Sequence, residues 1–143
     1  MTTSRTPVMV CLLVAGLLGS AAQAVVQYTL TDLGTLGGAY TLGFGLNNSG
    51  QAVGYSSTGQ YSLNQDAFRT APNRSINPSM DDLGRLGGTL GVAYGINSSG
   101  QVTGFSELAQ SGNHVPEHAF RTSPNRAIVP AIDDLGALGS DYS

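Results

Sequence analysis

The sequence predicts an all-β protein made of tandem four-stranded antiparallel repeat units of about 50 residues, arranged as a partial β-propeller-like array. A motif that begins Asp32-Leu33-Gly34 recurs at Asp82 and again at Asp134, with steps of 50 and 52 residues. An Asn-x-Ser-Gly turn lies between apolar segments at the same place in both copies. After the first 24 residues, no segment has the apolar spacing of a helix. A flat or curled array of the same sheets is the alternative arrangement.

Residues 1–24 are predicted to be a secretory signal peptide that precedes the β-repeat region 25–143. Arg5 supplies a basic start, residues 8–18 form an apolar run, and Ala22-Gln23-Ala24 is an A-x-A cleavage pattern. The apolar run is shorter than the roughly 18 residues that a bilayer span needs. We therefore expect cleavage between Ala24 and Val25, a secreted, periplasmic or cell-surface location, and no membrane span in the mature chain.

The charge of the chain limits which partners it can bind, and its cysteine content limits whether disulfides can stabilise it. The chain carries six arginines, no lysine and nine acidic residues, for a net charge of −3. A nucleic-acid partner is not expected, because a phosphate backbone is met by a basic stripe. The single cysteine, Cys11, lies within the predicted signal peptide. The mature chain must therefore be held together by apolar packing and strand pairing without disulfides.

The units are predicted at residues 32–81 and 82–133, with a third unit begun at residue 134. Residues 26–31 are predicted to be an entry strand ahead of the first unit, because polar and apolar side chains alternate there. Each unit then opens with a β-hairpin. Its turn is closed by Asn47 and Gly50 in the first copy and by Asn97 and Gly100 in the second. Asn caps its own turn, and Gly accepts the positive φ that follows.

The second half of each unit is predicted to hold two further strands. Residues 67–70 and 119–122 form the third strand of each copy, and a Pro-Asn-Arg turn follows. Residues 76–83 and 128–135 form the fourth strand. The two copies differ in the length of one loop, which lies between Ser56 and Ala67 in the first copy and between Ser106 and Ala119 in the second. We expect this loop to face solvent, because a buried strand cannot absorb an insertion without losing register.

These motifs together resemble a known family. The segments Asp82-Leu83-Gly84, Tyr94-Gly95-Ile96-Asn97-x-Ser99-Gly100-Gln101 and His118-Ala119-Phe120 are similar to the bacterial extracellular HAF repeats, named for the His-Ala-Phe tripeptide. The resemblance covers nearly all of the mature chain. It implies an exported bacterial protein with a propeller-like β fold and no established catalytic residues. The first copy has Asp66 where the second has His118, so this histidine is not expected to be a ligand common to all units.

Two groups of residues have side chains that bind metal ions in other proteins. His114, Glu117 and His118 lie in or beside the longer loop and are candidate metal ligands. The first copy has no equivalent of this group, so the favoured interpretation is a polar loop without a metal or other cofactor. The paired carboxylates Asp81-Asp82 and Asp133-Asp134 are candidates for calcium. The favoured interpretation is that one Asp of each pair caps the glycine turn that follows it.

The sequence favours a non-catalytic binding or structural module at the cell surface or in the periplasm, with an unidentified ligand or cell-surface component as its partner. The copies share the same motifs in the same order, whereas an enzyme breaks repeat symmetry at its site. The alternative is a fragment of a larger propeller enzyme or ligand-binding protein whose active residues lie in missing blades. Two units are fewer than the four or so blades of a closed propeller. We therefore expect either an interrupted copy of a longer product or self-association through exposed edge strands.

Overall fold

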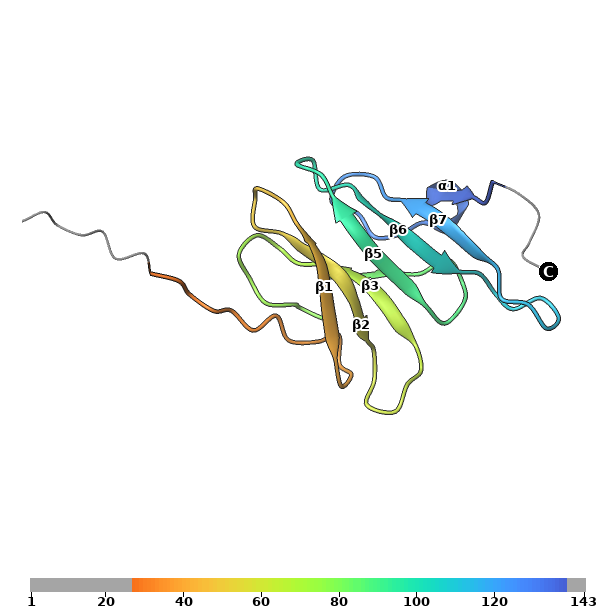
Figure 1. The fold of residues 1–143 in the computed structure, drawn as a ribbon, viewed down its shortest axis with the longest axis horizontal. Coiled ribbons are helices and arrows are strands. Elements are labelled where there is room, and N and C mark those ends of the chain that lie inside the picture. The colour runs from red at the N-terminus through yellow and green to blue at the C-terminus, as the bar shows by residue number, and fades with distance from the viewer. Residues whose placement is uncertain (1–26, 139–143) are drawn as a thin grey trace, which may run out of the picture.

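The computed structural model describes residues 27–138, which form two four-stranded antiparallel sheets (Figure 1). In both sheets each strand lies next to the strand that follows it in sequence. Sheet A contains β1 (Thr41–Leu46), β2 (Ala52–Ser57), β3 (Gln65–Arg69) and β4 (Asp82–Gly84). Sheet B contains β5 (Gly91–Ile96), β6 (Val102–Glu107), β7 (Glu117–Arg121) and β8 (Asp134–Gly136). The all-β class and the four-stranded sheets are confirmed, whereas the predicted signal peptide and its Ala24–Val25 cleavage site lie outside the described residues.

The two predicted hairpins are present, and their turns are closed as the sequence indicates. In sheet A the amide of Gly50 donates to the carbonyl of Asn47 at 2.9 Å, and the φ of Gly50 is +78°. The Oδ1 atom of Asn47 also accepts the amides of Ser49 and Gln51, at 3.1 and 3.0 Å. Sheet B repeats these bonds around Asn97 and Gly100.

Both hairpins contain the same irregularity. In sheet A the register changes from Gly43↔Gly54 to Gly45↔Val53, which leaves Phe44 as an extra residue. In sheet B the same shift leaves Tyr94 as the extra residue. We therefore call two residues corresponding when they hold the same position in sheets A and B.

The predicted entry strand is not formed in the described part of residues 26–31. Residues 27–31 have no strand structure, and they extend away from the sheets (Figure 1). In sheets A and B the corresponding fourth strand pairs with β3 or β7. Residues 27–31 pair with no strand of the described part of the chain, so alternation of side chains is not sufficient for a strand here.

The fourth strand is much shorter than predicted in both sheets. Residues 76–81 instead lead into a turn, in which the Asp81 amide donates to the carbonyl of Asn77 at 2.8 Å. In sheet B the same stretch contains a single helical turn, α1 (Pro130–Asp133), so the expectation of no helix is wrong there. Pro78 and Pro130 begin these turns, because proline supplies no amide for a strand ladder and has the φ of a helix start.

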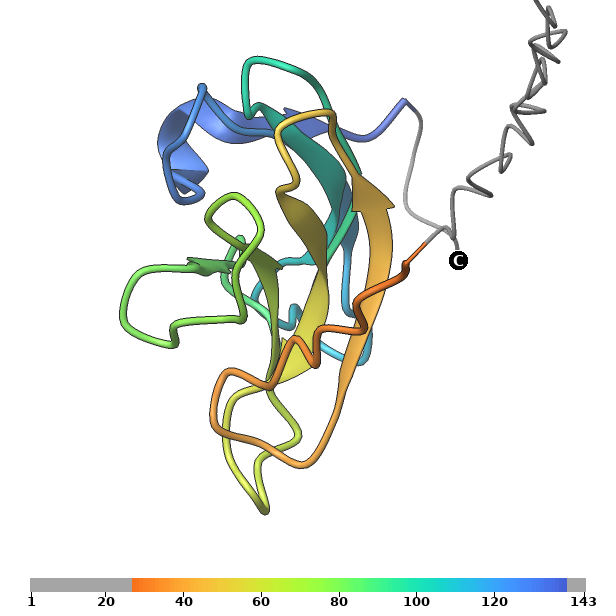
Figure 2. The ribbon, with the colours of Figure 1, turned by 90° about the vertical axis from the view of Figure 1, so that its left-hand side faces the viewer.

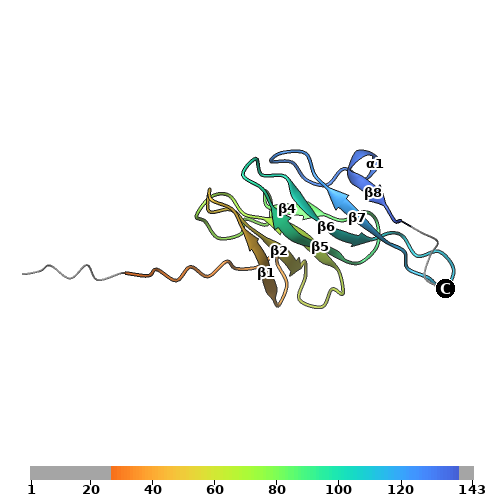
Figure 3. The ribbon, with the colours of Figure 1, turned by 45° about the horizontal axis from the view of Figure 1, so that its top comes forward.

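As a result, the sheets end later than the predicted units. Residues 82–84, assigned by sequence to the start of the second unit, form the last strand of sheet A. Residues 134–136 do the same in sheet B, and Figure 3 shows β8 beside α1. The motif that begins at Asp82 therefore joins one sheet to the next.

The third strands, the Pro-Asn-Arg turns and the variable loops agree with the sequence analysis. Strands β3 and β7 start two residues earlier than predicted, and Asn73 and Asn125 have φ values of 53° and 51°. Residues 60–63 and 109–113 are exposed. The loop between β2 and β3 projects beyond the strands that it joins (Figure 2). The loop is therefore placed in solvent as expected.

The main core lies between the two sheets, where β5 packs against β1, β2 and β3. Gly45 allows this close approach, because a Cβ there would lie 3.0 Å from the carbonyl oxygen of Tyr94. Among residues 27–138 no helix is long and apolar enough to cross a membrane. The core combines side chains from both sheets and from the segment that joins them: Val53, Ala67, Leu83, Leu86, Ala93, Val102, Phe120 and Ile128.

Candidate binding face

The three candidate metal ligands are not brought together. Glu117 and His118 are consecutive residues of β7, so their side chains leave opposite faces of the sheet. His118 Nδ1 lies 2.9 and 3.0 Å from the two carboxylate oxygens of Asp134, and His114 lies in the exposed loop. Within residues 27–138 no cluster of three or more His, Cys, Asp or Glu side chains could hold a metal ion.

The paired aspartates act as local caps, as the favoured interpretation states. Oδ1 of Asp82 accepts the amide of Gly84 at 2.8 Å, and Oδ1 of Asp134 accepts the amide of Gly136 at 2.7 Å. The preceding aspartates, Asp81 and Asp133, are buried. Each accepts a main-chain amide four residues earlier at 2.7 Å. The two carboxylates of each pair therefore serve different turns.

One pair of corresponding positions holds an acidic residue in sheet A and a histidine in sheet B. Asp66 of sheet A forms an ion pair with Arg85, and His118 holds its place in sheet B. Burial raises the pKa of Asp66 above its usual value, and the nearby Asp82 raises it further against the effect of Arg85. Burial also raises the pKa of Asp134, but the Gly136 amide and His118 outweigh this effect, so the net pKa is lowered.

The junction between the sheets has three side-chain donors from sheet A, each aimed at an oxygen of sheet B. Nδ2 of Asn47 donates to the carbonyl of Asn97 at 3.0 Å. The guanidinium of Arg69 donates to the carbonyls of Gly100 and Arg126, at 3.2 and 3.4 Å. Nε2 of Gln51 lies 3.5 Å from Oδ1 of Asn125. Sheet A therefore binds the turns of sheet B mainly through main-chain carbonyls.

The corresponding face of sheet B is open to solvent. Leu83 is 3% exposed at the junction, whereas its counterpart Leu135 is 57% exposed. Val53 is completely buried, whereas its counterpart Thr103 is exposed. We call the open surface the binding face, and it consists of Asn97, Gln101, Thr103, Arg121, Leu135 and Leu138.

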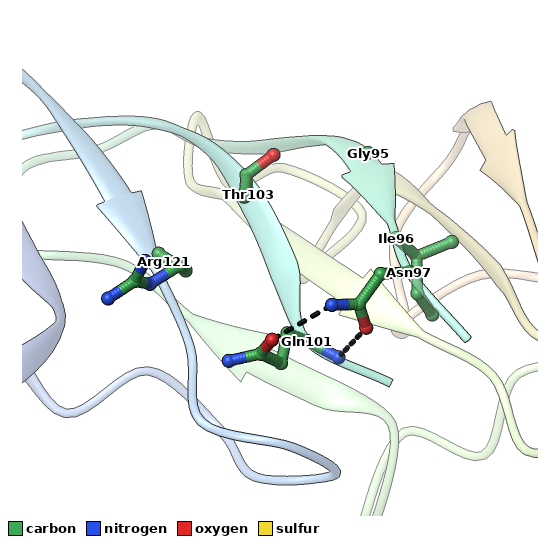
Figure 4. A pocket seen from close by; sticks show the side chains of 6 residues that line it. All are labelled: Gly95, Ile96, Asn97, Gln101, Thr103 and Arg121. Carbon is green, nitrogen blue, oxygen red and sulfur yellow. Dashed lines mark hydrogen bonds between the residues drawn. The ribbon is translucent and has the colours of Figure 1, made fainter. Parts of the chain in front are cut away.

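A shallow pocket of about 200 Å³ lies in the binding face. Its wall is formed by the end of β5, the start of β6 and Arg121 of β7 (Figure 4). Asn97 and Gln101, which belong to this wall, are joined by a hydrogen bond of 2.8 Å (Figure 4). Arg121 has no ion pair or side-chain hydrogen bond within the described part of the chain, whereas its counterpart Arg69 binds two carbonyls. The pocket of sheet B is therefore the counterpart of a site on sheet A, and that site on sheet A is occupied by sheet B.

A row of aromatic rings crosses the outer surface of both sheets. Neighbouring ring centroids are 5.1 to 6.2 Å apart, within the range of favourable aromatic pairs. The shortest distance joins Phe44 of β1 to Tyr94 of β5. The row therefore ties the two sheets together at the surface. Its members are Tyr40, Tyr55, Phe44, Tyr94 and Phe105.

Arg121, which lines the pocket of the binding face, is not among the candidate residues that the sequence indicated. The available signal was the Phe-Arg-Thr segment, in which Arg69 and Arg121 occupy the same place in a chain with only six basic residues. Repetition alone does not distinguish the two arginines, because their difference depends on what packs against each sheet.

Comparison with protein-family models, with curated proteins and with solved structures found no match to this chain. The resemblance to HAF repeats therefore stays a prediction from the motifs.

Proposed function

We propose that this chain is an exported, non-catalytic repeat module that binds a polypeptide through the binding face of sheet B. The observation that carries the proposal is the correspondence between Arg121, Asn97 and Gln101 and the three donors at the junction. The sheet A residues Arg69, Asn47 and Gln51 bind oxygens of a folded polypeptide, namely the turns of sheet B. In sheet B the corresponding Arg121 and Asn97 are exposed and Gln101 is half-buried, and all three line the pocket.

The chemistry of the face favours a protein partner. The guanidinium and amide groups supply donors in fixed positions, which match main-chain carbonyls at the end of a turn. Leu135 and Leu138 add an exposed apolar surface beside these donors. A nucleic acid would need several cations, and Arg121 is the single basic residue of the binding face.

The non-catalytic assignment is supported by the roles of the acidic side chains. Asp82 and Asp134 cap glycine turns, and Asp81 and Asp133 cap the turns before them. These carboxylates are thus committed to holding the chain in shape. Reproducible turnover of generic ester, glycoside or phosphoester substrates by the purified chain would favour the alternative of an enzyme-bearing propeller.

The proposed location and wider architecture come from the sequence. Residues 1–24 have the pattern of a secretory signal peptide, which places the mature chain in the periplasm, at the cell surface or outside the cell. We further propose that sheets A and B are consecutive blades of a propeller-like array. Their matching strand order and registers support this arrangement.

The proposal is tested by site-specific photo-crosslinking in the organism that produces the chain. A photo-reactive phenylalanine analogue at position 103 should form an adduct with a polypeptide, because Thr103 lies in the binding face. The same analogue at position 61 is the matched control, because Tyr61 is exposed in the loop between β2 and β3. Introducing Arg121→Ala should abolish the adduct at position 103. Equal adducts from both positions, or an adduct indifferent to Arg121→Ala, would contradict the proposal.

A further inference from the structure

The internal junction between sheets A and B indicates which kind of surface could pack against the binding face. We propose that its partner is a second copy of this chain, joined head to tail, with sheet A of one copy packed on sheet B of the next. The inference rests on the proposed function and names the polypeptide that the face binds. At the internal junction, sheet B packs on sheet A through one of its surfaces. The evidence for the inference is that sheet A presents the corresponding surface, which a second copy could pack on its binding face.

Sheet A carries the acceptors that the donors of the binding face require. At the internal junction the accepting oxygens belong to the turn at Asn97 and Gly100 and to the turn at Asn125. In sheet A the Asn73 amide donates to the carbonyl of Gly50 at 2.8 Å, and in sheet B the Asn125 amide donates to that of Gly100 at 3.2 Å. The turns of sheet A therefore present the corresponding oxygens in the same arrangement as the turns of sheet B.

Sheet A also exposes the apolar strand that a neighbour would cover. Leu42 and Leu46 of β1 are exposed, and Leu46 is 72% exposed. Their counterparts in β5 lie against sheet A. Val92 is buried, and Ile96 packs on the core. We call this surface of sheet A the head and the binding face of sheet B the tail. No sheet covers either of them within the described residues, and at the head only the segment of Leu33 takes part of the neighbour's place.

Different head and tail surfaces determine the kind of assembly. A heterologous contact forms a ring where its rotation closes and an open chain where it does not. Closed propellers have about four to eight blades. Each copy contributes two sheets, so a closed ring would hold about two to four copies.

The incoming copy must release one of its own segments to complete the contact. At the internal junction the Ile128 amide donates to the carbonyl of Leu83 at 2.9 Å. In sheet A the corresponding Ile76 amide donates to the carbonyl of Leu33 at 2.7 Å. Leu135 of one copy and Leu33 of the next therefore compete for the same place. Both belong to an Asp-Leu-Gly segment with the same aspartate cap, so the exchange replaces each hydrogen bond by an equivalent one.

The test is the mass of the purified full chain in solution, measured by size-exclusion chromatography with light scattering over a range of concentrations. We expect a discrete oligomer or a concentration-dependent series. Leu135→Asp on the tail and Leu46→Asp on the head should each reduce the mass to that of a monomer. Both side chains are largely exposed within one chain, so these changes leave its fold intact. Leu63→Asp is the matched control, because Leu63 is exposed in the loop and lies on neither surface.

Mixing the two monomeric variants distinguishes head-to-tail joining from other contacts. The Leu135→Asp variant keeps an intact head and the Leu46→Asp variant keeps an intact tail, so an equimolar mixture should form a heterodimer. Leu33→Ser, which weakens the competing segment, should increase association. A wild-type chain that stays monomeric at all concentrations, or association that persists in both Asp variants, would overturn the inference. If the chain is monomeric but the position-103 adduct still depends on Arg121, the binding face stands and its partner is another polypeptide.

Discussion

Gly100 combines two constraints at the end of the second hairpin turn. Its φ is +75°, in the left-handed region that side chains disfavour, and a Cβ there would lie 2.2 Å from Oδ1 of Asn125. Asn125 is also the residue that sheet A reaches through Gln51. A side chain at Gly100 would therefore strain the turn and displace a group of the junction.

We predict that Gly100→Ala lowers the free energy of unfolding by on the order of 1 kcal/mol or more. Gly112→Ala is the matched control, because Gly112 has a φ of +63° and a Cβ there would meet nothing within 4 Å. The control measures backbone strain alone, and thermal unfolding of both variants should show the larger loss for Gly100→Ala. Equal melting temperatures for Gly100→Ala and the parent would show that the turn does not hold the junction in place.

At the scale of the elements, β2 and β6 have the same place in their sheets but different surroundings. Val53 of β2 is completely buried between the sheets, whereas Thr103 of β6 lies on the binding face. The valine is therefore suited to a covered strand and the threonine to an open one.

Exchanging the two residue types tests this difference. Val53→Thr places a hydroxyl in the core and should cost about 1–3 kcal/mol of stability, the range for a buried polar group without a partner. Thr103→Val adds no buried polar group and should change stability by less than about 0.5 kcal/mol. Urea unfolding of the two variants provides the comparison. A similar loss in both would mean that the two faces are equally covered.

At the scale of the whole molecule, the two sheets share one core and cannot be treated as separate domains. Val53 and Ala67 of sheet A pack with Ala93, Val102 and Phe120 of sheet B. Stability therefore depends on the junction, as it does in arrays where each unit contacts its neighbours.

The processing of the whole chain is the third prediction. The pattern around Ala22-Gln23-Ala24 predicts that the leader is removed during export. Intact-mass analysis of the protein recovered from the periplasm or the medium should identify Val25 as its first residue. A cytosolic product that retains Met1 would contradict export.

The sequence was most informative where structure depends on near neighbours. The Asn-x-Ser-Gly turns and the Asp caps involve bonds between residues two to four apart, so their residue types determined them. The same local logic failed at residues 27–31, because a strand also needs a partner. It failed again at Pro130, where the missing amide of proline favoured a helical turn over a longer strand.

The tertiary structure decided which of two similar residues is covered and which is open to solvent. Leu83 and Leu135 occur in the same Asp-Leu-Gly motif, and Arg69 and Arg121 in the same Phe-Arg-Thr segment. Leu83 is covered and Arg69 is bonded because sheet B lies on sheet A, whereas the face that holds Leu135 and Arg121 is open. By itself the sequence determined the hairpin strands, the turns and the all-β class, since these depend on local hydrogen bonds and side-chain alternation. The binding face depends on which surfaces meet across the sheets, and only the packing of the folded chain specifies that.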